Sequence, residues 1–136
     1  MTTPIITYAA TLALFTAIDL VWLLGPGRSF YTSELGSLLR SQPNLTAAIA
    51  FYLLYAGGLT FFATLPGIKS AMPLHALGLG ALLGLVAYGC YDLTNLSVIN
   101  GFSLRIALID MAWGTVLSGV VSWLVCQWVL HLGLQA

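Results

Sequence analysis

The sequence predicts an all-α membrane protein: four transmembrane helices in an antiparallel bundle, with a short interfacial helix between spans one and two. Composition is the first reason, because 60% of the 136 residues are hydrophobic and 6% are charged, whereas a soluble domain carries about 25% charged residues. The second reason is that four apolar runs each approach the roughly 20 residues that cross a bilayer. The chain then forms a single four-helix domain, residues 1–136.

Glycine and proline mark the ends of the first two spans, which we predict at residues 4–24 and 45–65. Gly25-Pro26-Gly27 follows the first run and Pro66-Gly67 follows the second, and neither sequence favours a continuing helix. The segment between them is mixed, with apolar residues at i, i+4, i+7 and i+8: Tyr31, Leu35, Leu38 and Leu39. This spacing predicts a short amphipathic helix at about residues 29–40, lying in the membrane interface.

Spans three and four, predicted at residues 74–96 and 104–132, carry matching stripes of small residues. A short turn containing Asn100-Gly101 joins the two spans. Residues four apart share one helix face, and small residues on that face let two helices approach closely. We therefore expect an antiparallel hairpin packed on two stripes: Ala76, Gly80, Gly84, Tyr88 and Asp92 on span three, and Asp110, Gly114, Ser118, Ser122 and Cys126 on span four.

Three aspartates are predicted to lie at one depth. Asp19 and Asp92 come shortly before the ends of spans one and three, and Asp110 comes shortly after the start of span four. Those three span ends share one side of the membrane in an up-and-down bundle. A carboxylate inside the bilayer costs about 2.5–3.5 kcal/mol even on lenient scales, so it marks a functional site by default. The alternative is that Asp92 only ties helices together.

The aspartates and their polar or aromatic neighbours make up the candidate binding site. Three carboxylates at one depth need an offset, which could be retained protons, the nearby Arg105, or a bound divalent cation such as Mg²⁺, which prefers oxygen ligands. Asp92, Asp110 and Asp19 are the candidate metal ligands. The whole candidate set is Asp19, Trp22, Tyr88, Tyr91, Asp92, Thr94, Asn95, Arg105, Asp110 and Trp113.

We expect Asp92 and Asp110 to titrate as a coupled pair that keeps at least one proton near neutral pH. Asp19 is expected to matter less, because its helix lacks a matching stripe of small residues. The tyrosines outside the set, including Tyr52 and Tyr55, are most simply interpreted as packing or interface anchors.

The pattern D-x-x-W occurs twice, at Asp19 to Trp22 and at Asp110 to Trp113. Residues three apart share a helix face, so each indole N–H could hold the acid of its own motif. Chance recurrence is the alternative, since the chain has four tryptophans.

Three segments together resemble a known family: Asp19-x-x-Trp22-Leu23, Tyr91-Asp92-Leu93-Thr94-Asn95 and Asp110-x-x-Trp113-Gly114. They resemble the motifs of small four-pass bacterial membrane proteins that are catalogued as a domain of unknown function. The resemblance extends over nearly the whole chain. It implies a bacterial inner-membrane location and a four-helix fold, but no activity, substrate or catalytic residue.

Three function classes remain open. The favoured class is binding or translocation of a proton-linked ion or small polar solute through the aspartates. The alternatives are a divalent-metal-dependent membrane enzyme acting on a lipid or small molecule, and a structural or assembly subunit. An enzyme is not favoured, because the chain is small and has no catalytic motif.

Charge bears on the partners and on the orientation. The net charge is zero and there is no basic run, so we expect no nucleic-acid partner. The expected partners are the lipid bilayer, an unidentified small ligand or ion, and further copies of the chain, since four helices enclose a narrow lumen. Arg28, Arg40 and Arg105 oppose Lys69 across the predicted topology, which favours both termini in the periplasm.

Overall fold

The computed structural model describes all 136 residues, and every regular element in it is a helix. Four helical segments are long and apolar enough to cross a membrane: Thr2–Leu24, Leu45–Lys69, Pro73–Val98 and Leu104–His131. The predicted four-span, all-α architecture is therefore confirmed. The elements in order are α1 (Thr2–Leu24), α2 (Pro26–Leu35), the 3₁₀ turn η1 (Gly36–Leu38), α3 (Leu45–Leu59), the π-helical segment η2 (Thr60–Thr64), α4 (Leu65–Lys69), α5 (Pro73–Val98) and α6 (Leu104–His131).

The short helix between the first two spans is confirmed, but it begins earlier than predicted. Only Gly25 separates α1 from α2, and Pro26 stands in the first turn of α2, where a missing N–H costs no helical hydrogen bond. The helix ends at Leu35 because Gly36 takes a positive φ of 53°. Together with η1 the helical segment covers residues 26–38, a few residues earlier than the predicted range of about 29–40.

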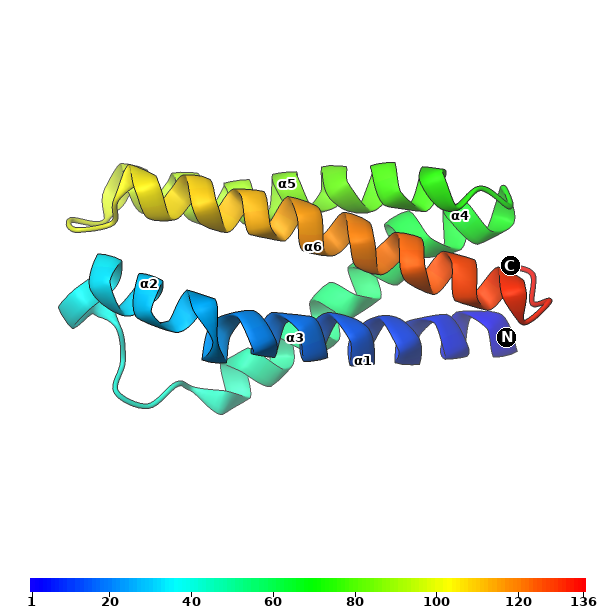
Figure 1. Cartoon of the computed structure of the whole chain (residues 1–136), viewed down its shortest axis with the longest axis horizontal. Coiled ribbons are helices and arrows are strands. Elements are labelled where there is room, and N and C mark those ends of the chain that lie inside the picture. The colour runs from blue at the N-terminus through cyan, green and yellow to red at the C-terminus, as the bar shows by residue number, and fades with distance from the viewer.

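The second span does not stop at Pro66 as predicted. The helix runs on to Lys69, with Pro66 in the first turn of α4 and the π-helical segment η2 directly before it. Proline lacks an N–H and crowds the carbonyl four residues back, and a wider π-helical turn can absorb such a break. Along this span, α3 contacts α1 whereas η2 and α4 contact α5, so the span crosses the bundle obliquely (Figure 1).

The hairpin of α5 and α6 packs on the two predicted stripes. Ala76, Gly80, Gly84 and Asp92 are buried on α5. A Cβ added to Gly84 would overlap the carbonyl oxygen of Gly114, and a Cβ added to Gly114 would overlap the ring of Tyr88. Glycine is therefore required by the close approach of the two backbones, as the stripes predicted.

Helix α1 buries a stripe of its own. Its buried residues fall four apart, at Thr3, Thr7, Thr11, Phe15 and Asp19. The expectation that the helix of Asp19 lacks such a stripe was wrong, because threonines take the positions that glycine and alanine take on α5.

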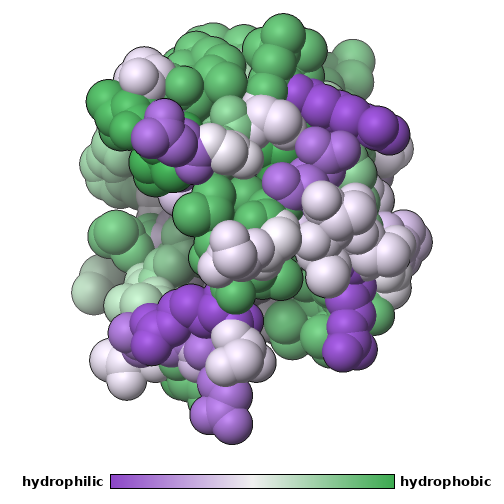
Figure 2. Space-filling model, turned by 90° about the vertical axis from the view of Figure 1, so that its left-hand side faces the viewer, coloured by the Kyte–Doolittle hydropathy of each residue, from purple (hydrophilic) through white to green (hydrophobic).

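The two ends of the bundle differ in their packing. Both termini lie at one end, and α2 and the turn between α5 and α6 lie at the other (Figure 1). We call the second one the acid end, since α1 and α5 finish there. The main apolar core lies between the acid end and the termini and consists of Phe15, Leu59, Ile68, Ala76, Leu117, Val121, Val125, Cys126 and Val129. Viewed onto the acid end, the surface shows several hydrophilic patches between apolar ones (Figure 2).

Candidate functional site

A cavity of about 630 Å³ opens at the acid end, bounded by α1, α2, α3, α5 and α6. Asp19, Asp92 and Asp110 all line it. The structure therefore brings together the three acids that the sequence placed at one depth. Most of the other lining residues are aromatic or aliphatic, as is usual for a small-molecule pocket with a few convergent polar groups.

Asp19 has a hydrogen-bond donor for each carboxylate oxygen. The Tyr52 hydroxyl donates to Oδ2 at 2.6 Å, and Nε1 of Trp113 donates to Oδ1 at 2.9 Å. Tyr52 comes from α3 and Trp113 from α6, so this carboxylate joins three helices. Tyr52 does pack against the core residue Phe15, but the interpretation of it as a packing residue missed its bond to Asp19.

Asp110 is held by a relay from the short helix α2. Nε1 of Trp22 donates to the Tyr31 hydroxyl at 3.2 Å, and that hydroxyl donates to Oδ1 of Asp110 at 2.7 Å. Burial raises the pKa of the Tyr31 phenol above its usual value, and the negative charge of Asp110 adds to the increase. The phenol therefore keeps its proton and acts as a donor.

The two D-x-x-W motifs exchange partners. Trp113 holds Asp19, while Trp22 is linked to Asp110, and the two indoles stack with centroids 4.7 Å apart at 20°. The prediction that each indole holds its own acid was wrong. Since α1 and α6 run in opposite directions, the aspartate of each motif lies level with the tryptophan of the other.

Asp92 is the exception among the three acids. It is fully buried at 0% exposure, and neither carboxyl oxygen has a donor. Asp110 lines the same cavity, but no hydrogen bond joins the two carboxyl groups. Two carboxyl groups can hydrogen-bond only when one of them carries a proton, so the expected pairing of Asp92 with Asp110 stays a prediction.

Four of the sequence-predicted site residues do not line the cavity: Trp22, Thr94, Asn95 and Arg105. Arg105 is 72% exposed at its side chain, and its Nη1 lies 3.7 Å from Oε1 of Glu34. The guanidinium is therefore engaged outside the cavity, which disfavours Arg105 among the three offsets left open by the sequence. Tyr88 and Tyr91 do line the cavity.

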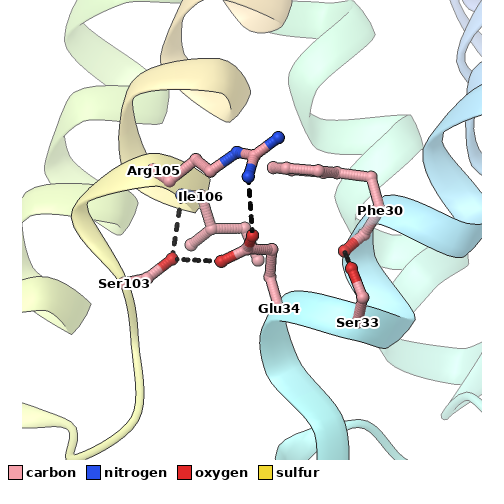
Figure 3. Close-up of polar contacts among 6 residues, drawn as sticks. All are labelled: Phe30, Ser33, Glu34, Ser103, Arg105 and Ile106. Carbon is pink, nitrogen blue, oxygen red and sulfur yellow. Dashed lines mark hydrogen bonds and ion pairs between the residues drawn. The ribbon is translucent and has the colours of Figure 1, made fainter.

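Helix α2 is tied to the first turn of α6 by Glu34 (Figure 3). The hydroxyl of Ser103 donates to Oε2 of Glu34 at 2.8 Å and accepts from the backbone N–H of Ile106 at 3.1 Å. The Arg105 guanidinium also lies 5.7 Å from the ring centre of Phe30. These contacts hold α2 against the mouth of the cavity, where its residue Leu35 forms part of the wall.

Comparison with known proteins identifies a family. The family model described as "Predicted membrane protein (DUF2177)" matches residues 4–127. The chain belongs to this family. The match confirms the resemblance that the sequence motifs indicated. No curated protein and no solved structure matched the chain.

In this DUF2177 protein the three aspartates do not converge on one point. No group of three His, Cys, Asp or Glu side chains has the arrangement of a metal site. The reason is that Asp19 directs both its oxygens toward Tyr52 and Trp113. A cation held jointly by Asp19, Asp92 and Asp110 therefore finds no support in this geometry.

Sequence reasoning missed three tyrosines of this DUF2177 cavity: Tyr31, Tyr52 and Tyr55. Tyr55 shares a hydrogen bond of 2.7 Å with Ser118, and its ring lies 5.1 Å from that of the buried Phe15. Depth could have identified Tyr52. It lies seven residues into a span that starts at the acid end, so a rise of 1.5 Å per residue places it near the level of Asp19.

Proposed function

We propose that this protein binds an amphiphilic small molecule in the aspartate cavity. The apolar body of the ligand packs on the aromatic and aliphatic walls, and a hydroxyl or ammonium group donates to the Asp92–Asp110 pair. The single observation that carries the proposal is Asp92, which is fully buried in a cavity wall with no donor for either oxygen.

The contrast among the acids supports a binding role. Asp19 and Asp110 receive donors from aromatic side chains of other helices, as expected for carboxylates that hold helices together. Asp92 lacks such a donor, and leaving a buried polar group unpaired is costly. A proton shared with Asp110 meets this need in the empty cavity, and a ligand donor meets it in the occupied one.

Of the classes left open by the sequence, ligand binding fits these contacts best. A structural subunit needs no cavity, and a metal enzyme would need ligands that converge. Translocation would need a route past the apolar core that begins at Phe15 and continues through Leu117 and Val121. Binding of a proton-linked solute therefore remains in the proposal, whereas transport through a single chain does not.

The setting of the site is also part of the proposal. We place the protein in a bacterial inner membrane with both termini in the periplasm, so that the acid end faces the cytoplasm. Cysteines introduced at Ser33 and Ser70 should then label from the cytoplasmic and periplasmic sides respectively, and labelling of both from one side would contradict this orientation. Self-association, expected because four helices enclose little space, is measured by chemical crosslinking in the same membranes.

The binding test uses octylamine and 1-octanol as probes, added to purified protein in lipid nanodiscs. Trp113 lines the cavity and stacks on Trp22, so tryptophan fluorescence should change saturably as either probe binds. An ammonium group that replaces the shared proton should release it, which calorimetry detects as a dependence of the binding enthalpy on the buffer.

Asp92→Asn keeps the size of the side chain but cannot ionise. We expect octylamine affinity to fall by a factor of about ten or more, the equivalent of about 1.4 kcal/mol, with an unchanged melting temperature. Thr94→Val is the matched control, because Thr94 is exposed on the same helix and does not line the cavity. If neither probe saturates and Asp92→Asn simply melts earlier, the acids are contacts between helices and the proposal fails.

A further inference from the structure

A second cavity of about 590 Å³ adjoins the first and is lined by α3, η2 and α5, with Tyr8 from α1. The two cavities share Tyr55 and Ala87 in their walls. The second one is lined entirely by apolar residues, tyrosines and two glycines, and includes Leu83 of α5. The two cavities are therefore neighbours that meet at Tyr55 and Ala87.

The second cavity exists because of the path and composition of the second span. The span contacts α5 mainly after residue 59, so earlier residues of α3 leave the face of α5 open. Gly57 and Gly58 then form a notch, and a Cβ at Gly58 would meet nothing within 4 Å. The notch is flanked by Leu54, Phe61 and Phe62, with exposed fractions of 80%, 68% and 60%. In a membrane-spanning bundle such exposed apolar side chains face lipid chains.

We infer that the ligand of the aspartate cavity is a single-chain lipid with a hydroxyl or amine headgroup, whose chain passes Tyr55 and Ala87 and lies over the notch of Gly57 and Gly58. This rests on the proposed function, since the headgroup occupies the same Asp92–Asp110 pair. The lipid enters sideways from the bilayer between α3 and α5, and its chain is held by van der Waals packing, because burial from lipid into protein brings no hydrophobic gain.

Charge selects the headgroup. No lysine or arginine lines either cavity, whereas three carboxyl groups line the first. Arg105, one of the four basic residues of the chain, is paired with Glu34 outside the cavity. A carboxylate or phosphate headgroup would be buried beside acids with no cation to offset it, which is strongly unfavourable. A hydroxyl or ammonium instead supplies the donor that Asp92 lacks.

The border that the two cavities share favours a ligand with one hydrocarbon chain. Tyr55 and Ala87 are the only lining residues that the two cavities have in common, and the Tyr55 ring is fixed by its hydrogen bond to Ser118 and its contact with Tyr88 at 5.9 Å. A ligand that occupies both cavities must pass between this ring and the methyl group of Ala87, and one linear chain needs the least room to do so.

The test compares 1-hexadecanol with 1-octanol on the purified protein in nanodiscs, using Gly58→Leu to fill the notch. A Cβ added at Gly58 meets no neighbouring atom within 4 Å, so the variant should fold. Gly78→Leu is the matched control, because Gly78 lies on α5, also meets nothing within 4 Å, and lines neither cavity.

We expect Gly58→Leu to lower the affinity for 1-hexadecanol by a factor of about ten and to leave the affinity for 1-octanol unchanged. Gly78→Leu should alter neither affinity. A 1-hexadecanol probe with a photoreactive diazirine in mid-chain should label α3 near Gly58 and α5 near Leu83. Hexadecanoic acid should compete poorly with this probe.

Each other result overturns a defined part of the inference. Equal binding of 1-hexadecanol to the wild type and Gly58→Leu would exclude the notch as the chain site while leaving octanol binding, and thus the proposed function, intact. Equal competition by hexadecanoic acid would exclude the headgroup assignment. Failure of 1-octanol and octylamine to bind would instead defeat the proposed function itself.

Discussion

The packed part of the bundle, toward the termini, and the acid end satisfy their buried polar groups in different ways. In the packed part, two buried threonines bond within their own helix: Thr7 donates to the carbonyl of Thr3 at 2.7 Å and Thr60 to that of Ala56 at 2.8 Å. The buried hydroxyls of Thr11 and Ser122 have no partner on another helix. At the acid end, aromatic side chains bond to acids on other helices, as Trp113 does to Asp19.

This difference explains why one region is filled and the other is hollow. A side chain that bonds within its helix needs no distant partner, so helices can close on stripes of small residues until their backbones touch. An indole or phenol that reaches an acid on another helix holds the two helices at the length of its ring. The contacts that join the helices at the acid end therefore also keep those helices apart.

The largest effect on the free energy of unfolding is expected when a large side chain replaces a glycine of the packed part. Gly84→Leu would place a side chain against the carbonyl oxygen of Gly114 and against Ser118, and backbone cannot move aside as a flexible side chain can. We expect a loss of more than about 3 kcal/mol, beyond the usual range for overpacked cores, measured as thermal unfolding or yield in detergent. Gly78→Leu is the control and should unfold like the wild type. Equal tolerance of both variants would contradict the close packing described for α5 and α6.

An intermediate effect on the free energy of unfolding is expected when an aromatic donor to an acid is removed at the acid end. Trp113→Phe keeps the ring but removes the donor to Asp19, and should cost about 1.5–3 kcal/mol, the usual value for a hydrogen bond to a charged group. In a double-mutant cycle, Trp113→Phe and Asp19→Asn should couple, because the two side chains bond directly. The matched pair Trp22→Phe and Asp19→Asn, within one motif, should be nearly additive. Coupling within the motif instead would contradict the exchanged partners.

The smallest effect on stability is expected when the contact between α2 and α6 is weakened. Glu34→Gln weakens the contact with the exposed Arg105, and exposed ion pairs contribute about 0–1 kcal/mol. The amide can still accept from Ser103, so the melting temperature should hardly change. Octylamine should bind and dissociate faster if α2 covers the mouth of the cavity, which stopped-flow fluorescence measures. Unchanged rates would show that α2 is a fixed wall.

Much of the fold could be predicted from the sequence, because hydropathy and spacing are local properties. Span limits followed from apolar runs and from Gly and Pro, and the α5–α6 interface followed from residues four apart. The exception was Pro66, because the second span continues past it to Lys69. Pro26 follows the end of the first span as predicted and also lies in the first turn of α2. Whether a proline ends a helix or lies in the first turn of the next depends on the helix that follows, so the residue alone does not decide it.

The sequence by itself determined a four-span membrane bundle and the three aspartates gathered at one end of it, since depth along a helix can be counted from its ends. Only the tertiary structure decided which donor each acid receives: Trp113 for Asp19, Tyr31 for Asp110, and none from the rest of the chain for Asp92. Counting residues fixes height along the bundle, whereas a hydrogen bond also depends on how the helices are rotated and spaced. Those two variables are set by packing between segments far apart in the chain.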